Sequence, residues 1–273
     1  MEFEKVVSFY KKAAEKGYQA FFSPAFEKIN HFQDKTVVFF DRKGNFYALR
    51  EDFTKSVVDY KKRLGLASVK VWYADYVYRY AMDELTAEYQ LGLEKIPWRD
   101  SRDTLEVLEI IVSAAVEFFG NSLIVEISDT RVYEDLLKEV PQELHKTVLD
   151  LVDSKNLAEI EFLSRVRRLD LSRIEKIIED SFYRREVEHL ESLDVRPEVR
   201  ERLKETAVFL KRHFPEVEVE IDLTLARTVE EYNGLIFIVY DSNTSKLVAA
   251  GGEYSSNGEI GVGGTIYLEG KTC

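Results

Sequence analysis

The sequence predicts an α+β fold whose sheet draws on segments far apart in the chain. Strand patterns occur at both ends, at 37–49, 69–96 and 217–268, and an almost continuous helical pattern separates them between Val132 and about His213. Strands at both ends with helices between them are typical of this class, because the sheet has to assemble from distant segments.

The elements follow from the spacing of apolar residues along the chain. Spacings of three and four predict a helix around residues 6–14, and a glycine-containing turn predicts a β-hairpin at 37–49. A second helix is expected at 51–64, and two long strands that pair antiparallel. The two long strands are expected at 69–80 and 86–96. The remaining expected elements are a helix at 102–119, a buried strand at 123–127, and strands at 217–223, 234–240, 246–251 and 260–268.

One strand carries an unusual row of side chains. Glu88, Gln90, Gly92 and Glu94 alternate along 86–96 and therefore share one face. Such polarity favours a solvent-facing strand, although a glycine within the row also leaves room for a ligand against the sheet.

Composition excludes several classes of protein. The 273 residues carry 38 − 50 = −12 formal charges and a single cysteine, Cys273. The sequence contains neither a cysteine framework nor a run of about 18 apolar residues, as a membrane helix needs. The N-terminus does not resemble a signal peptide. We expect a soluble cytosolic protein, and the acidic balance argues against broad binding to nucleic acid.

The common motifs of autonomous catalysis are absent from the sequence. It has no phosphate loop, dinucleotide fingerprint, paired-histidine zinc helix or nucleophile elbow. Arg79 and Arg227 are more informative, because each lies in an apolar strand context and needs a counter-charge. That counter-charge is either a structural carboxylate or the carboxylate or phosphate of a ligand.

Five segments, taken in chain order, resemble the catalytic core of histidyl-tRNA synthetase, a class II aminoacyl-tRNA synthetase. Residues 23–27 are similar to its Pro-x-Phe-Glu block and 49–54 to its Leu-Arg-Pro-Glu-x-Thr segment. Residues 76–80 with 89–94 resemble motif 2, and 225–237 resemble the histidine-recognition signature. The last resemblance is that of 251–254 and 261–269 to the approach to motif 3. The resemblance implies a class II synthetase-like core over 1–273, mainly an antiparallel sheet flanked by helices, with a helical insertion at about 141–215.

The departures from that family concern the grip on ATP. The motif 3 arginine is replaced by Gly270, and the arginine of the Gly-Gly-Arg-Tyr block is Glu253. The motif 2 loop at 81–86 contains no arginine, and we expect no anticodon-binding domain after the core. Adenylyl transfer needs such cations to stabilise the transferring group, so we expect activation of an amino acid by ATP to be lost.

The resemblance implies that an amino-acid pocket is retained. Asp52, Thr54 and Gln90 would hold the α-amino group of histidine, and Arg79 would lie near its carboxylate. The carboxylate or the imidazole would be surrounded by Arg227, Tyr232, Glu94 and Tyr254. No catalytic residue, metal or cofactor is expected.

A synthetase-like chain of this kind resembles the regulatory-subunit family of ATP phosphoribosyltransferase, including the Leu-Arg-x-Asp-x-Thr form at Asp52. The resemblance implies a non-catalytic subunit that activates the short-form catalytic subunit, dimerises within a hetero-octamer and binds L-histidine for feedback on histidine biosynthesis. Neither tRNA nor a membrane is an expected partner. Two alternatives remain open: a truncated synthetase paralogue that still makes histidyl-adenylate, and a scaffold that has lost its ligand.

Overall fold

The structure is a computed structural model that describes residues 2–29, 36–81, 84–183, 190, 195–226 and 232–271. It divides into two compact units. The first comprises residues 1–118, 246–249 and 256–273, and the second comprises 119–245 and 250–255. Each unit therefore combines segments from distant parts of the sequence, as the α+β prediction requires.

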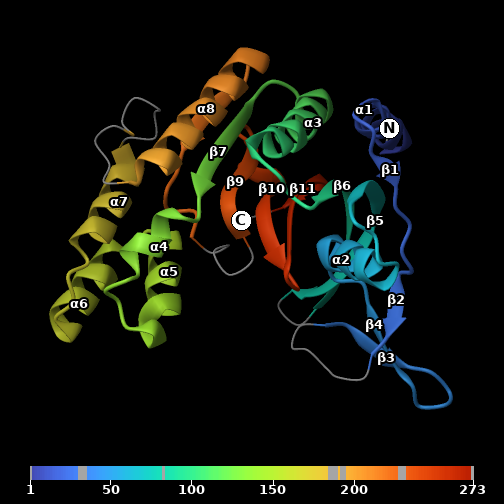
Figure 1. Ribbon diagram of the computed structural model, residues 1–273, viewed down its shortest axis with the longest axis horizontal. Coiled ribbons are helices and arrows are strands. Elements are labelled where there is room, and N and C mark those ends of the chain that lie inside the picture. The colour runs from blue at the N-terminus through green and yellow to red at the C-terminus, as the bar shows by residue number, and fades with distance from the viewer. Residues whose placement is uncertain are drawn as a thin grey trace. The chain divides into compact units, whose positions relative to one another are not determined.

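Among its described residues, the first unit contains three helices, four neighbouring strands of the main sheet and a small separate sheet (Figure 1). Its strands run in the order β1-β5-β6-β11, and its small sheet has the order β2-β4-β3. Its elements are α1 (Glu2–Glu15), β1 (Gln19–Ala20), β2 (Phe26–Lys28), β3 (Val38–Phe40), β4 (Phe46–Leu49), α2 (Phe53–Arg63), β5 (Val69–Ala81), β6 (Glu84–Ile96), α3 (Ser101–Phe119) and β11 (Glu259–Lys271).

The β5–β6 pair confirms the predicted antiparallel strands and their faces. Tyr73 lies opposite Gly92 and Asp75 opposite Gln90, while β11 pairs antiparallel with the other edge of β6. Leu91 and Leu93 are fully buried on one face. On the opposite face, however, Gln90 and Glu94 are only 5% and 2% exposed. The predicted solvent-facing strand is therefore wrong at these positions, and α2 covers this face at Glu94 and Tyr73.

Helix α2 is fixed on that face by its first turn. The side chain of Asp52 caps the helix by accepting a hydrogen bond from the backbone N–H of Lys55 at 2.9 Å. The next residue, Phe53, stacks on the ring of Tyr73 with a centroid separation of 3.9 Å. The cap and the stacked ring together place Thr54 over the sheet.

The Tyr73 ring also explains the glycine in the polar row. A Cβ atom at Gly92 would lie 2.3 Å from the Tyr73 ring. The space that the sequence suggested for a ligand is therefore filled by a tyrosine side chain of the neighbouring strand, and the predicted gap at Gly92 is absent.

The other face of β5 and β6 carries an ionic cluster. Glu106 of α3 accepts from Lys70 at 3.0 Å, from Lys95 at 3.1 Å and from the Tyr18 hydroxyl at 3.1 Å. Lys95 also lies 2.6 Å from Asp103. These contacts attach α3 to the two long strands.

The second unit contains the predicted helical stretch. Strand β7 pairs in parallel with β8 and antiparallel with β9. Strand β10 has residues in both units. The elements are β7 (Leu123–Asp129), α4 (Val132–Leu136), a 3-10 turn η1 (Gln142–Leu144), α5 (His145–Asp153), α6 (Leu157–Arg167), α7 (Ser172–Tyr183), α8 (Pro197–His213), β8 (Glu218–Ile221), β9 (Tyr232–Asp241) and β10 (Lys246–Ser256).

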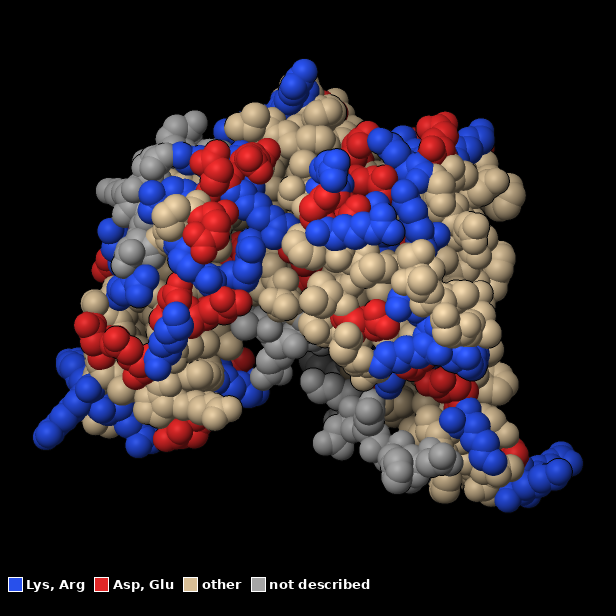
Figure 2. All heavy atoms as spheres, viewed as in Figure 1, with Lys and Arg blue, Asp and Glu red and all other residues tan. Residues whose placement is uncertain are grey.

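The helices of this unit present mixed charges outward. Figure 2 shows Lys and Arg side chains interspersed with Asp and Glu over α5, α6 and α7, on the left of the view. This pattern is that of the solvated helix faces expected from the density of charge in the sequence. No helix in the described part of the chain is long and apolar enough to cross a membrane.

We expect Glu106→Gln to destabilise the protein in a pH-dependent way. Burial raises the pKa of Glu106, but the ammonium groups of Lys70 and Lys95 outweigh it and the net pKa is lowered. A carboxyl group whose pKa is lower in the folded state stabilises the protein at pH values above its unfolded-state pKa. This stabilisation is lost as the pH falls through its folded-state pKa. The variant should lose about 1–3 kcal/mol of unfolding free energy at pH 7, and this loss should shrink as the pH falls through the folded-state pKa of Glu106, measured by urea denaturation.

Glu109→Gln is the matched control on the same helix. Glu109 pairs with Lys16 at 2.9 Å, but both side chains are exposed, and such pairs contribute about 0–1 kcal/mol. Equal losses in the two variants, or a Glu106 effect that does not shrink as the pH is lowered, would contradict the assignment.

Candidate functional site

The candidate site in the first unit is the polar row of β6 together with the start of α2. Glu94 is its most buried member, and its Oε1 accepts a hydrogen bond of 2.6 Å from the Thr54 hydroxyl. A Cβ atom at Gly263 of β11 would lie 2.2 Å from Glu94 Oε2. The carboxylate therefore lies directly against the β11 backbone, and only glycine leaves it that room.

Gln90 extends the site along the same face. Its amide nitrogen donates to Glu88, and Glu88 lies 3.0 Å from the ammonium of Lys271. Lys271 in turn lies over the Tyr267 ring, 3.8 Å from its centroid. Burial lowers the pKa of Lys271, assisted by Arg79, while Glu88 and Asp52 act in the opposite direction.

Asp52 and Arg79 form the more open end of the site. Their side chains are 3.9 Å apart and each is 44% exposed, and Arg79 Nε donates to the backbone carbonyl of Glu51 at 2.9 Å. Of the two counter-charges expected for Arg79, the structure shows a carboxylate of the protein, that of Asp52. Because the pair is exposed and loosely spaced, both groups retain access to a ligand.

Tyr73 lies opposite Gly92, between Gln90 and Glu94 on the same sheet face. Its hydroxyl shares a hydrogen bond of 2.9 Å with Thr265. Burial, followed by the charge of Glu94, raises the pKa of Tyr73 far above its ordinary value. The phenol therefore remains protonated at neutral pH, as a neutral hydrogen-bonding group below the carboxylates.

The structure brings together five of the eight predicted site residues in this unit: Asp52, Thr54, Arg79, Gln90 and Glu94. Tyr232 is half-buried and Tyr254 is 5% exposed, and both belong to the second unit. Arg227 lies outside the described residues. Tyr73 and Lys271 were not predicted: no local pattern distinguishes either residue from an ordinary strand position, and only the strand register places them here.

The grouping suits an amino acid. Asp52, Glu88 and Glu94 supply three carboxylates against the two cations Arg79 and Lys271. The excess of acceptors favours an ammonium group, while a guanidinium at the open end suits a carboxylate. Among the described residues, no group of three or more His, Cys, Asp or Glu side chains is arranged to hold a metal ion.

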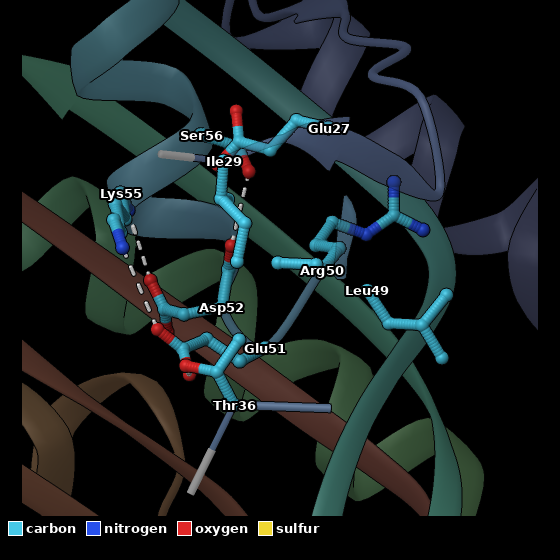
Figure 3. A pocket seen from close by; sticks show the side chains of 10 residues that line it. Glu27, Ile29, Thr36, Leu49, Arg50, Glu51, Asp52, Lys55 and Ser56 are labelled. Atoms are coloured by element: carbon cyan, nitrogen blue, oxygen red, sulfur yellow. Dashed lines mark hydrogen bonds and ion pairs between the residues drawn. The ribbon is translucent and has the colours of Figure 1, made fainter. Parts of the chain in front are cut away.

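A cavity of about 200 Å³ lies beside the first turn of α2 (Figure 3). In Figure 3, Glu51, Asp52 and Lys55 point toward one another, whereas the Arg50 guanidinium points away. Lys55 lies 3.6 Å from Glu51, and Arg50 is 2.7 Å from Asp75. Of the predicted site residues that the structure describes, only Asp52 lines this cavity. Most of the predicted pocket residues that the structure describes in this unit therefore lie on the sheet face and not in this cavity.

The fold and these motif positions define a class of protein. The family model for histidyl-tRNA synthetase matches residues 4–269, nearly the whole chain. A histidyl-tRNA synthetase structure from Nostoc sp. PCC 7120 superposes with a TM-score of 0.79 at 15% identity, covering 98% of this chain and 70% of that one. At this identity the likeness shows the fold alone, which is that of a class II synthetase core, as predicted.

Closer relatives place the chain within that class. An ATP phosphoribosyltransferase regulatory subunit from Thermotoga maritima is 61% identical over 274 residues, covering 100% of this chain and 99% of the relative. A structure described as the ATP phosphoribosyl transferase (HisG:HisZ) complex from the same organism matches with a TM-score of 0.93 at 60% identity, covering 100% of this chain and 99% of that chain. The chain therefore belongs to the family of ATP phosphoribosyltransferase regulatory subunits.

More distant members of the family are longer. The regulatory subunit from Bacillus mycoides is 25% identical over 265 residues, covering 88% of this chain. This chain spans only 62% of that relative's length.

We expect Thr54→Val to destabilise the protein through Glu94. Valine keeps the shape of threonine but lacks the hydroxyl that donates to the buried carboxylate. Loss of a donor to a buried charged group costs about 1–3 kcal/mol of unfolding free energy, measured by urea denaturation at pH 7. Thr54→Ser keeps the hydroxyl and should lose clearly less. The role assigned to this hydrogen bond is wrong if serine and valine lose the same.

Proposed function

We propose that this chain is a non-catalytic subunit that activates the short-form catalytic subunit of ATP phosphoribosyltransferase and binds L-histidine as a feedback signal. The observation that carries the proposal is the buried polar face of β6. Gln90 and Glu94 are almost fully buried, and burying such groups is costly unless they are paired or have a ligand to bind. Their retention beside Thr54, Asp52 and Arg79 supports an amino-acid pocket.

The positions that grip ATP in the synthetase support the loss of catalysis. Gly270 has a backbone φ of +67°, a conformation that side-chain-bearing residues rarely adopt. A Cβ atom there would also lie 2.9 Å from Lys246 Cδ. An arginine at this position, as motif 3 has, would be strained in this backbone, and Lys271 is already bound to Glu88.

The roles within the pocket follow from the chemistry of histidine. The acceptors Asp52, Thr54 and Gln90 suit its ammonium group, and Arg79 with Arg227 suits its carboxylate. Glu94, Tyr232 and Tyr254 suit the imidazole, because a carboxylate that accepts from a ring N–H selects one tautomer. Histidine regulates only if it binds one state of the assembly better than another. The proposed assembly is a dimer of this chain with catalytic subunits in a hetero-octamer, in the cytoplasm and without tRNA.

The first test is a calorimetric titration of the full-length chain with L-histidine. Saturable binding is expected, and Asp52→Asn should weaken it by about ten- to hundredfold, the loss of one hydrogen bond to a charged group. Asparagine still caps a helix, so α2 should remain intact. Asp59→Asn on the exposed side of α2 is the control with the same change of charge. Arg227→Ala should abolish binding.

Absence of histidine binding both to the isolated chain and to its complex with the catalytic subunit would overturn the sensor proposal.

The second test is reconstitution with the short-form catalytic subunit. Adding the wild-type chain should raise the phosphoribosyltransferase rate, and L-histidine should lower it. Asp52→Asn should activate as the wild type does but require about ten- to hundredfold more histidine for inhibition, in line with its loss of histidine affinity. Activation without any response to histidine in the wild-type complex would leave a scaffold, and no activation would refute the regulatory role.

A further inference from the structure

A buried ion pair in the second unit connects α8 to the strands that carry two predicted histidine-binding residues. Arg202 of α8 binds Glu253 of β10, and their side chains are only 11% and 2% exposed. Glu253 directly precedes Tyr254 in β10. The pair therefore joins the helical stretch, whose role the sequence did not reveal, to the predicted site.

The second oxygen of Glu253 contacts the start of β9. Glu253 Oε2 accepts a hydrogen bond of 3.3 Å from the backbone N–H of Leu235. A Cβ atom at Gly234 would lie 2.1 Å from the same oxygen, and Gly234 has a φ of +139°. The carboxylate thus occupies the space beside a glycine that lies two residues after Tyr232.

Thr130, the residue that follows β7, contacts the same glycine. Gly234 N–H donates to the Thr130 hydroxyl at 2.8 Å, and Thr130 N–H donates back to the Gly234 carbonyl at 2.9 Å. Thr130 is 4% exposed. Residues 232–235 are therefore fixed jointly by the end of β7, by β10 and, through Glu253, by α8.

Stability alone is a poor reason for such a pair. Removing two charges from water costs free energy that offsets most of their mutual attraction. Replacing a buried ion pair by apolar side chains is therefore often neutral for stability. Burial, assisted by the nearby Arg131, lowers the pKa of Arg202 to about 10, so the guanidinium is still charged at pH 7. A charged pair that also binds one particular backbone N–H is satisfied in only one arrangement of the strand.

The sequence gives this pair a second meaning. The position of Glu253 holds an arginine in the synthetase-like Gly-Gly-Arg-Tyr block, so the charge at this point of β10 is reversed. The cation that balances it comes from α8. We propose that Arg202 and Glu253 are positioning residues for histidine binding: they hold residues 232–235 and Tyr254 in the arrangement that receives the ligand. This inference rests on the proposed histidine-binding function.

The test compares histidine affinity with folding stability in the full-length chain. Arg202→Met should weaken histidine binding at least tenfold in calorimetry under conditions where circular dichroism shows the variant folded. Arg202→Lys keeps a cation and should recover most of the affinity. The double variant Arg202→Met/Glu253→Leu removes both charges and should fold, yet still bind weakly, because Leu235 N–H has lost its acceptor.

A reversed pair gives a sharper criterion. Arg202→Glu with Glu253→Arg restores the ion pair but offers Leu235 no acceptor, so affinity should stay low. Lys61→Met is the control: Lys61 is 10% exposed and pairs with Glu259 at 2.8 Å in the first unit. It should cost stability without changing the dissociation constant for histidine.

The outcomes separate the inference from the function on which it rests. Suppose that the wild type binds histidine. The positioning role is then refuted if the folded Arg202→Met variant, or the double variant, has a dissociation constant for histidine within twofold of the wild-type value. If the reversed pair regains full affinity, the contact with Leu235 is refuted as its cause. If the wild type binds no histidine, alone or with the catalytic subunit, the proposed function itself has failed.

Discussion

A carboxylate buried on the face of a sheet is the constraint around which the first unit is organised. Glu94 is covered by α2, accepts a hydrogen bond from the Thr54 hydroxyl and lies against the β11 backbone at Gly263. A buried carboxylate without such donors would be expensive. The start of α2, the register of β11 and the glycine opposite Glu94 therefore have to be compatible. Asp52 fixes the helix start by capping α2 directly before the buried Phe53.

Charge rearrangement distinguishes this chain from the synthetases whose fold it shares. At Gly270 a cation is absent, and the backbone there is left-handed. At Glu253 the charge is reversed, and Arg202 of the helical stretch balances it. The polar groups of the proposed amino-acid site are retained, whereas the two positions that match cations of the synthetase motifs carry Gly270 and Glu253. This difference supports the proposed regulatory role, since cationic clamps stabilise the group that is transferred in catalysis.

Both units use glycine in the same way, to let a carboxylate reach a neighbouring backbone. Gly263 admits Glu94 in the first unit, and Gly234 admits Glu253 in the second. Gly92 differs, because an aromatic ring takes the space. A glycine in a strand thus indicates a close approach without naming the approaching group. That is why its function is read correctly only once the strand register is known.

The sequence by itself determined the class of fold, the long antiparallel pair and the helical stretch, because periodicity is a local property. The resemblance of its motifs to the synthetase family also predicted a site at Asp52, Thr54, Arg79, Gln90 and Glu94, and the structure places these five residues near one another. The tertiary structure decided which of these groups are buried and what they contact. Strand polarity predicted exposure for Gln90 and Glu94, but both are buried, and a helix from another part of the unit covers Glu94. Likewise, Tyr73, Lys271 and Arg202 gain their roles from strand register and helix packing, which join residues that no local pattern relates.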